Sequence, residues 1–85
     1  MRIYMQTMHL PEQPLRFYQL QIQKDLLGGW LLVRESGVQG MRGQVKTEHF
    51  SDRDEAERRL IHFRDQQAKR GYQVVFREGA QLETD

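Results

Sequence analysis

Cysteine is missing from this chain, so disulfide bonds and thiolate chemistry are excluded. A chain without cysteine gains nothing from an oxidising compartment, and this favours a cytoplasmic location. Long apolar runs are missing too: none approaches the ~20 residues of a membrane span, and the mean hydropathy is −0.80. The first six residues lack the continuous apolar segment of a secretory signal. We therefore expect no association with a membrane.

A strong excess of one charge is also absent. The chain has 13 Lys and Arg residues against 12 Asp and Glu, a net charge of +1, and an isoelectric point near 8.2. Domains that bind nucleic acid often exceed an isoelectric point of ~9, so composition alone assigns no such role. With 29% charged and 38% hydrophobic residues among 85, the sequence predicts one globular domain with a modest core.

Few groups are available for catalysis or metal binding. The three histidines, His9, His49 and His62, match no metal-ligand spacing. Neither Ser36 nor Ser51 lies in the context of a nucleophile, and Ser51 is interpreted as the cap of a helix. We therefore predict a protein that is not an enzyme and that holds no cofactor and no metal.

The first half of the chain reads as strands. Tyr18, Leu20 and Ile22 alternate with polar residues, which is typical of a half-buried strand. Both prolines lie in segment 10–14, which is predicted to be a loop. The segment from Lys24 to Gly29 is interpreted as a hairpin turn. Strands are therefore expected at about 1–8, 15–23, 30–35 and 43–49.

Three regularly spaced glycines, Gly37, Gly40 and Gly43, predict a tight connection with positive φ at several points. This turn would gather polar and basic side chains at one end of a sheet: Arg34, Gln39, Arg42, Gln44 and Lys46. Backbone N–H groups flanked by cations can contact a phosphate. A hairpin that simply needs glycines explains the same pattern. The spacing is not that of a nucleotide-binding loop.

After residue 50 the apolar period becomes helical. A helix is predicted from Asp52 to Arg70, with Ala56, Leu60 and Phe63 on its apolar face, and Gly71 ends it. Its second half is basic and forms another candidate phosphate-binding surface, although charged helix faces are usually only solvated. The members of that set are Arg58, Arg59, Arg64, Lys69 and Arg70. A last strand is expected over 72–76.

These elements predict an α+β fold, in which an antiparallel sheet of four to five strands carries one long amphipathic helix on a face. Residues 1–76 would form the single domain. Residues 77–85 are predicted to be a flexible polar tail.

The order of elements from Arg16 to Tyr72 resembles a WGR domain, a module of poly(ADP-ribose) polymerases and of small stand-alone bacterial proteins. The segment Phe50–Ala56, FSDRDEA, is similar to the family's F-x-S/D-x-x-E-A. In the family signature W-G-R-x-G-x-x-G-Q, the three glycines and the glutamine match this chain at positions 37, 40, 43 and 44. Ser36 and Val38 take the places of the signature Trp and Arg.

The resemblance implies a WGR-like, non-catalytic nucleic-acid-binding module, with DNA preferred over RNA. Because the signature Trp and Arg are replaced, phosphate binding would fall to Arg34, Arg42 and Lys46, and further polar contacts to Gln39 or Gln44.

Loss of the signature equally suits an alternative, a protein–protein interaction or homodimerisation module that no longer binds DNA. Five apolar residues are expected in edge or loop positions for such contacts: Met5, Met8, Leu26, Leu27 and Met41. The first strand is expected to pair across an edge.

Overall fold

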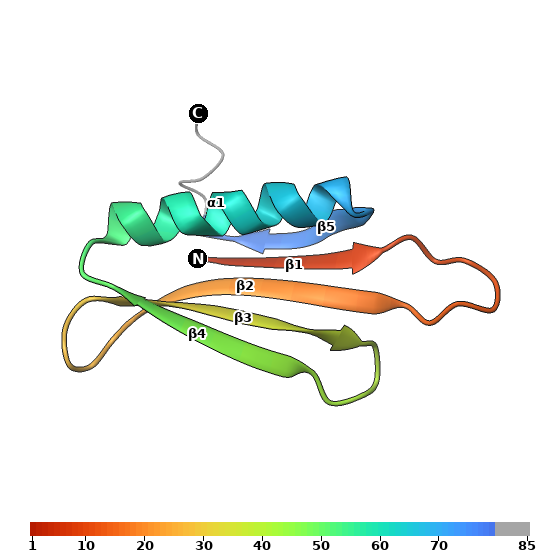
Figure 1. The fold of residues 1–85 in the computed structure, drawn as a ribbon, viewed down its shortest axis with the longest axis horizontal. Coiled ribbons are helices and arrows are strands. Elements are labelled where there is room, and N and C mark those ends of the chain that lie inside the picture. The colour runs from red at the N-terminus through yellow and green to blue at the C-terminus, as the bar shows by residue number, and fades with distance from the viewer. Residues whose placement is uncertain (80–85) are drawn as a thin grey trace.

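The computed structural model describes residues 1–79, in which five strands and one helix form a single layered unit (Figure 1). The elements in chain order are β1 (Arg2–Thr7), β2 (Arg16–Lys24), β3 (Trp30–Val38), β4 (Gln44–Phe50), α1 (Arg53–Lys69) and β5 (Tyr72–Glu78). The strands make one sheet in the order β4-β3-β2-β1-β5, and every neighbouring pair is antiparallel. The predicted α+β fold is confirmed. No helix of the described part is long and apolar enough to cross a membrane.

The helix connects the two edges of the sheet. Strand β4 lies at one edge and β5 at the other, so the chain must return across three strands between them. The 17 residues of α1 extend over about 25 Å at ~1.5 Å per residue. The helix runs alongside the strands, from the end of β4 to the start of β5, and covers one face of the sheet (Figure 1).

The core lies between this face and α1. On the sheet side, Tyr18, Leu20 and Ile22 are buried as their alternation predicts. Burial of apolar surface is the main favourable term in folding, and the remaining core side chains come from β1, β3 and the predicted helix face: Ile3, Met5, Leu32, Ala56, Leu60 and Phe63. Gln67 continues the helical row as a buried polar residue.

Three predicted details are wrong. The helix is capped by Asp52, whose carboxylate accepts from the Asp54 N–H at 3.2 Å, and not by Ser51. The strand β1 lies inside the sheet, between β2 and β5, so Met5 faces the helix and is completely buried. The last strand extends to Glu78, which adds the first two residues of the expected tail to the sheet. Residues 80–85 of that tail lie outside the described part.

The three regularly spaced glycines, Gly37, Gly40 and Gly43, serve close packing more than turning. Of these three, only Gly40 has a positive φ, of 86°. A Cβ atom on Gly37, which belongs to β3, would lie 3.0 Å from the Gly43 Cα, and one on Gly43 would lie 2.9 Å from Cζ of Phe17. The expectation of positive φ at several of these points is therefore wrong. Two of the three glycines are needed because chain and ring approach each other closely.

The hairpin between β2 and β3 offers a paired test of backbone strain and steric overlap. Gly28 and Gly29 both have positive φ, but a Cβ on Gly28 meets nothing within 4 Å, whereas one on Gly29 would lie 2.6 Å from the Phe50 carbonyl oxygen. We expect Gly28→Ala to lower the free energy of unfolding by ~1–2 kcal/mol through strain alone. Gly29→Ala should lower it by ~1–3 kcal/mol more. Urea denaturation followed by circular dichroism measures both, and equal losses would contradict the overlap.

Candidate nucleic-acid interface

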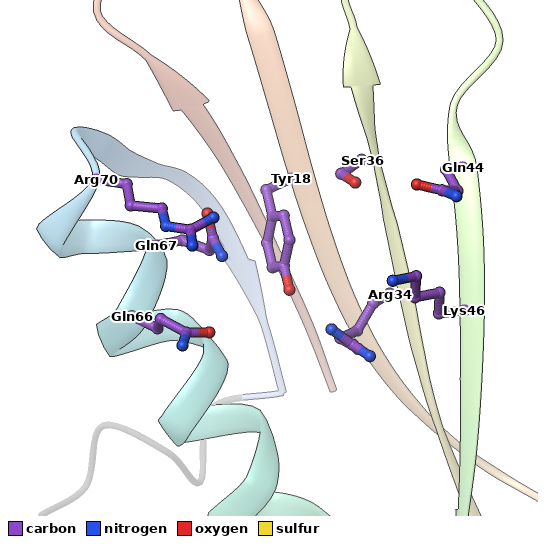
Figure 2. A pocket seen from close by; sticks show the side chains of 8 residues that line it. All are labelled: Tyr18, Arg34, Ser36, Gln44, Lys46, Gln66, Gln67 and Arg70. Carbon is purple, nitrogen blue, oxygen red and sulfur yellow. The ribbon is translucent and has the colours of Figure 1, made fainter.

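A hollow of about 220 Å³ lies between the sheet and the C-terminal half of α1 (Figure 2). We call it the basic groove. The sheet lines it with Tyr18 from β2, Arg34 and Ser36 from β3, and Gln44 and Lys46 from β4. The helix end lines it with Gln66, Gln67 and Arg70. Antiparallel pairing sets this arrangement, because Tyr18 is opposite Ser36, Ser36 is opposite Gln44 and Arg34 is opposite Lys46.

The charges of the groove are all positive. Arg34, Lys46 and Arg70 line it, and no lining residue is acidic. Within residues 1–79, none of the five ion pairs of the structure involves these three cations. Their charge is therefore not neutralised by the described part of the protein, and it is available to an anionic ligand.

Arg34 is held in place by an aromatic ring. Its guanidinium carbon lies 3.9 Å from the centroid of the Phe63 ring, and Arg59 approaches the same ring at 4.7 Å. A guanidinium over an aromatic face is attracted by the ring quadrupole. Since Phe63 is buried in the core, this contact anchors Arg34 at the boundary between core and groove. No acidic residue in the groove lining competes for its N–H groups.

A second hollow continues the basic groove toward the end of the sheet. The two share Ser36 and Gln44 in their linings, and the second adds the cations Arg16 and Arg42. No ion pair within residues 1–79 involves either of them. Five cations thus follow one continuous surface, and such a stripe is the electrostatic feature that phosphate backbones recognise.

Four of the five predicted site residues meet on this surface and one does not. Arg34, Gln44 and Lys46 line the basic groove, and Arg42 lines the adjoining hollow. Gln39 instead accepts a hydrogen bond from the Tyr4 hydroxyl at 2.9 Å. Tyr4 alternates with the buried Ile3 and Met5, so it lies on the sheet face that α1 leaves uncovered. The structure therefore separates Gln39 from the other four.

The basic half of the helix does not form the single surface considered above. Arg59 pairs with Glu48 at 3.5 Å, and Arg64 pairs with the neighbouring Asp65 at 3.0 Å. Of that set, Arg70 lines the groove.

Sequence reasoning missed several members of the site, among them Arg16 and Gln67. Arg16 lies two residues before Tyr18 on the same strand, and period-2 alternation could have placed both on one face. Gln67 follows Ala56, Leu60 and Phe63 at helical spacing, and its polarity concealed it. Nothing in the local pattern signalled that the helix end would face β3 and β4.

Over residues 1–79, no three His, Asp or Glu side chains come together in a way that could hold a metal ion. His49 instead contacts the Gly28 carbonyl oxygen at 2.9 Å and Asp25 at 3.6 Å, in the hairpin between β2 and β3.

Comparison with known proteins gives a family and one relative. The sequence model of the WGR domain matches residues 1–79. The chain is similar to the uncharacterized protein y4dW of Sinorhizobium fredii (strain NBRC 101917 / NGR234), with 31% identity over 71 residues. That match covers 84% of this chain and 35% of the relative, so the chain spans about a third of that protein's length. No solved structure matches the chain.

Proposed function

Since this chain belongs to the WGR domain family, a family associated with nucleic-acid binding, we propose that it is a non-catalytic module that binds DNA through phosphate contacts. The observation that carries the proposal is the continuous stripe of five cations, Arg16, Arg34, Arg42, Lys46 and Arg70, without acidic partners in the described residues. We place its action in the cytoplasm, where a chain without cysteine has no disadvantage.

The proposed mode of binding is electrostatic. Phosphate contacts position a protein on a duplex and carry no sequence information. The two hollows offer guanidinium groups, one ammonium group and the amides of Gln44 and Gln66, which suit phosphate and sugar oxygens. Ser36 and Val38 replace the aromatic and cationic signature residues, so the contacts shift from the signature to the cations around it. We therefore expect the chain to bind DNA with little preference for its base sequence.

Salt dependence tests this directly. Neutralising about three to four phosphates predicts a slope near −3 for log K against log salt concentration. Fluorescence anisotropy of labelled blunt, nicked and single-stranded DNA, and of an RNA duplex, measures the slope between low and moderate salt. We expect DNA to bind more tightly than RNA. Absence of salt-sensitive binding at tens of micromolar protein would remove the proposal.

A second candidate, homodimerisation, draws on one different observation. The edge strand β5 exposes three consecutive apolar residues, Val74, Val75 and Phe76, at 43%, 59% and 45%. An exposed apolar edge is a template for pairing with another chain. The apolar residues expected for this role from the sequence, apart from the buried Met5, are exposed in the loops and turns between strands: Met8, Leu26, Leu27 and Met41.

Sedimentation velocity over a range of protein concentrations tests whether the edge strand β5 mediates a dimer. Val75 has no partner in the register of β1 with β5, so Val75→Lys should disturb the fold little. If β5 mediates a dimer, the variant should sediment as a monomer where the wild-type chain associates, because a lysine ammonium blocks edge pairing. Val45→Lys, at 56% exposure on the opposite edge, is the matched control. A wild-type chain that stays monomeric throughout would exclude the dimer.

A further inference from the structure

One buried polar atom of the groove has no partner. The Tyr18 hydroxyl is enclosed and makes no hydrogen bond within the described residues, although the large majority of buried side-chain polar atoms in proteins are paired. Leaving such a group unpaired costs stability. Tyr18 is only 7% exposed, and its ring packs edge-on against Tyr72 with the centroids 6.0 Å apart. The ring is therefore fixed; Tyr18 is one of the residues that line the basic groove, and its hydroxyl points between Gln66 and Arg34 (Figure 2).

The same groove concentrates charge without compensation. Arg34, Lys46 and Arg70 converge from β3, β4 and the helix end toward the space beside the Tyr18 ring (Figure 2). Like charges repel one another more strongly beside a low-dielectric core than in open water. A fixed donor and three cations around one hollow are together the features of an anion site.

We propose that the basic groove holds one phosphate group, which accepts a hydrogen bond from the Tyr18 hydroxyl and is neutralised by Arg34, Lys46 and Arg70. At about 220 Å³, the hollow holds more than one water, at ~30 Å³ each, and is smaller than the ~300–1,000 Å³ of sites for drug-sized ligands. A single tetrahedral oxyanion with part of its hydration shell suits that volume. The small Ser36, opposite Tyr18 in the strand register, leaves the space open.

This inference deepens the proposed function and rests on it for one point, the source of the phosphate. The group is either a backbone phosphate of DNA or that of a small free anion, since both present the same oxygens. The planar guanidinium groups of arginine suit either one through paired N–H donors.

Nuclear magnetic resonance of the ¹⁵N-labelled chain tests the site with inorganic phosphate, replacing sodium chloride at constant ionic strength so that screening is unchanged. We expect millimolar phosphate to shift the backbone amides of Ser36 and Gln67 and to leave that of Lys24, at the other end of the sheet, in place. Tyr18→Phe removes only the hydroxyl and should weaken phosphate binding about tenfold or more, as for the loss of a hydrogen bond to a charged group.

Two further variants keep this result interpretable. Tyr4→Phe makes the same change on the uncovered sheet face and should bind phosphate like the wild-type chain. Lys46→Gln alters an exposed residue that the core does not need, and should weaken phosphate binding while the melting temperature stays the same. Tyr18→Phe should melt at the same temperature or higher without phosphate, because the lost hydroxyl has no partner.

The outcomes of these experiments distinguish the proposed phosphate site from the proposed DNA-binding function. Phosphate shifts that a short DNA duplex displaces from the same amides would support both, with the backbone as the source. Phosphate shifts in the groove of a chain that binds no DNA would support the pocket and overturn the proposed function. If the chain binds DNA but phosphate shifts none of the groove amides, and Tyr18→Phe binds DNA like the wild type, the phosphate site is overturned. The proposed function then still stands.

Discussion

Arg42→Glu combined with Lys46→Glu should weaken DNA binding on the order of a hundredfold at low salt. The two residues lie in the two adjoining hollows, so the pair of changes removes a cation from each and introduces an anion in its place. Each lost phosphate contact should also reduce the salt slope by about one, and the double variant should therefore show a slope flatter by about two. Both side chains are exposed, so the fold should be retained.

The control for this result has the same change of net charge elsewhere. Lys24→Glu with Arg77→Glu alters two exposed cations that line neither hollow, one at the end of β2 near the hairpin and one on the far edge strand. Anisotropy titrations of both double variants separate a localised interface from a general effect of charge. Equal losses in the two variants would show that the stripe has no special role.

The part of the fold that sequence could predict is the part set by neighbours along the chain. Alternation in β2 places Tyr18, Leu20 and Ile22 on one face, and helical spacing places Ala56, Leu60 and Phe63 on another. Each pattern must bury its apolar side, and one sheet with one helix satisfies both. These expectations hold because the period of an element is local information.

The site depends on relations that are not local. Arg16 and Arg70 are 54 positions apart and reach one surface because α1 runs back along the sheet and ends near the start of β2. Strand register decides the rest. Arg34 and Lys46 are opposite each other on the helix side, and a shift of either strand by one residue would turn its cation to the other face. Gln39 lies just beyond the end of β3, where alternation no longer assigns a face, and its hydrogen bond to Tyr4 decides the side.

The glycine pattern shows the same limit. From spacing alone, Gly37 and Gly43 suggest a turn, whereas their actual constraint is the approach of two chain segments and the Phe17 ring. Phe17 is separated from Gly43 by most of two strands, so no window of sequence contains the contact. Identical residues can thus be required for close packing at one position and for positive φ, as at Gly40, at the next.

Leu60→Ala should lower the free energy of unfolding by ~2–5 kcal/mol, the usual range for truncating a buried leucine. Leu60 is completely buried in the core cluster that also contains Leu20 and Leu32, so it fastens the middle of α1 to the sheet. A domain of this size has ~5–15 kcal/mol in total, and the loss is therefore a large share. Leu27→Ala, at a side chain 96% exposed in the hairpin, should change stability by less than ~0.5 kcal/mol.

The same substitution links stability to binding. The wall of the basic groove formed by Gln66, Gln67 and Arg70 belongs to the helix end, and it exists only while α1 stays on the sheet. Urea titrations of Leu60→Ala with and without DNA should therefore show a midpoint that rises with DNA concentration, because a ligand that binds only the folded chain stabilises it by mass action. A variant within ~1 kcal/mol of wild type would mean that the core does not hold the helix through Leu60. A midpoint that does not change with DNA would mean that DNA does not bind the folded chain in preference to the unfolded one.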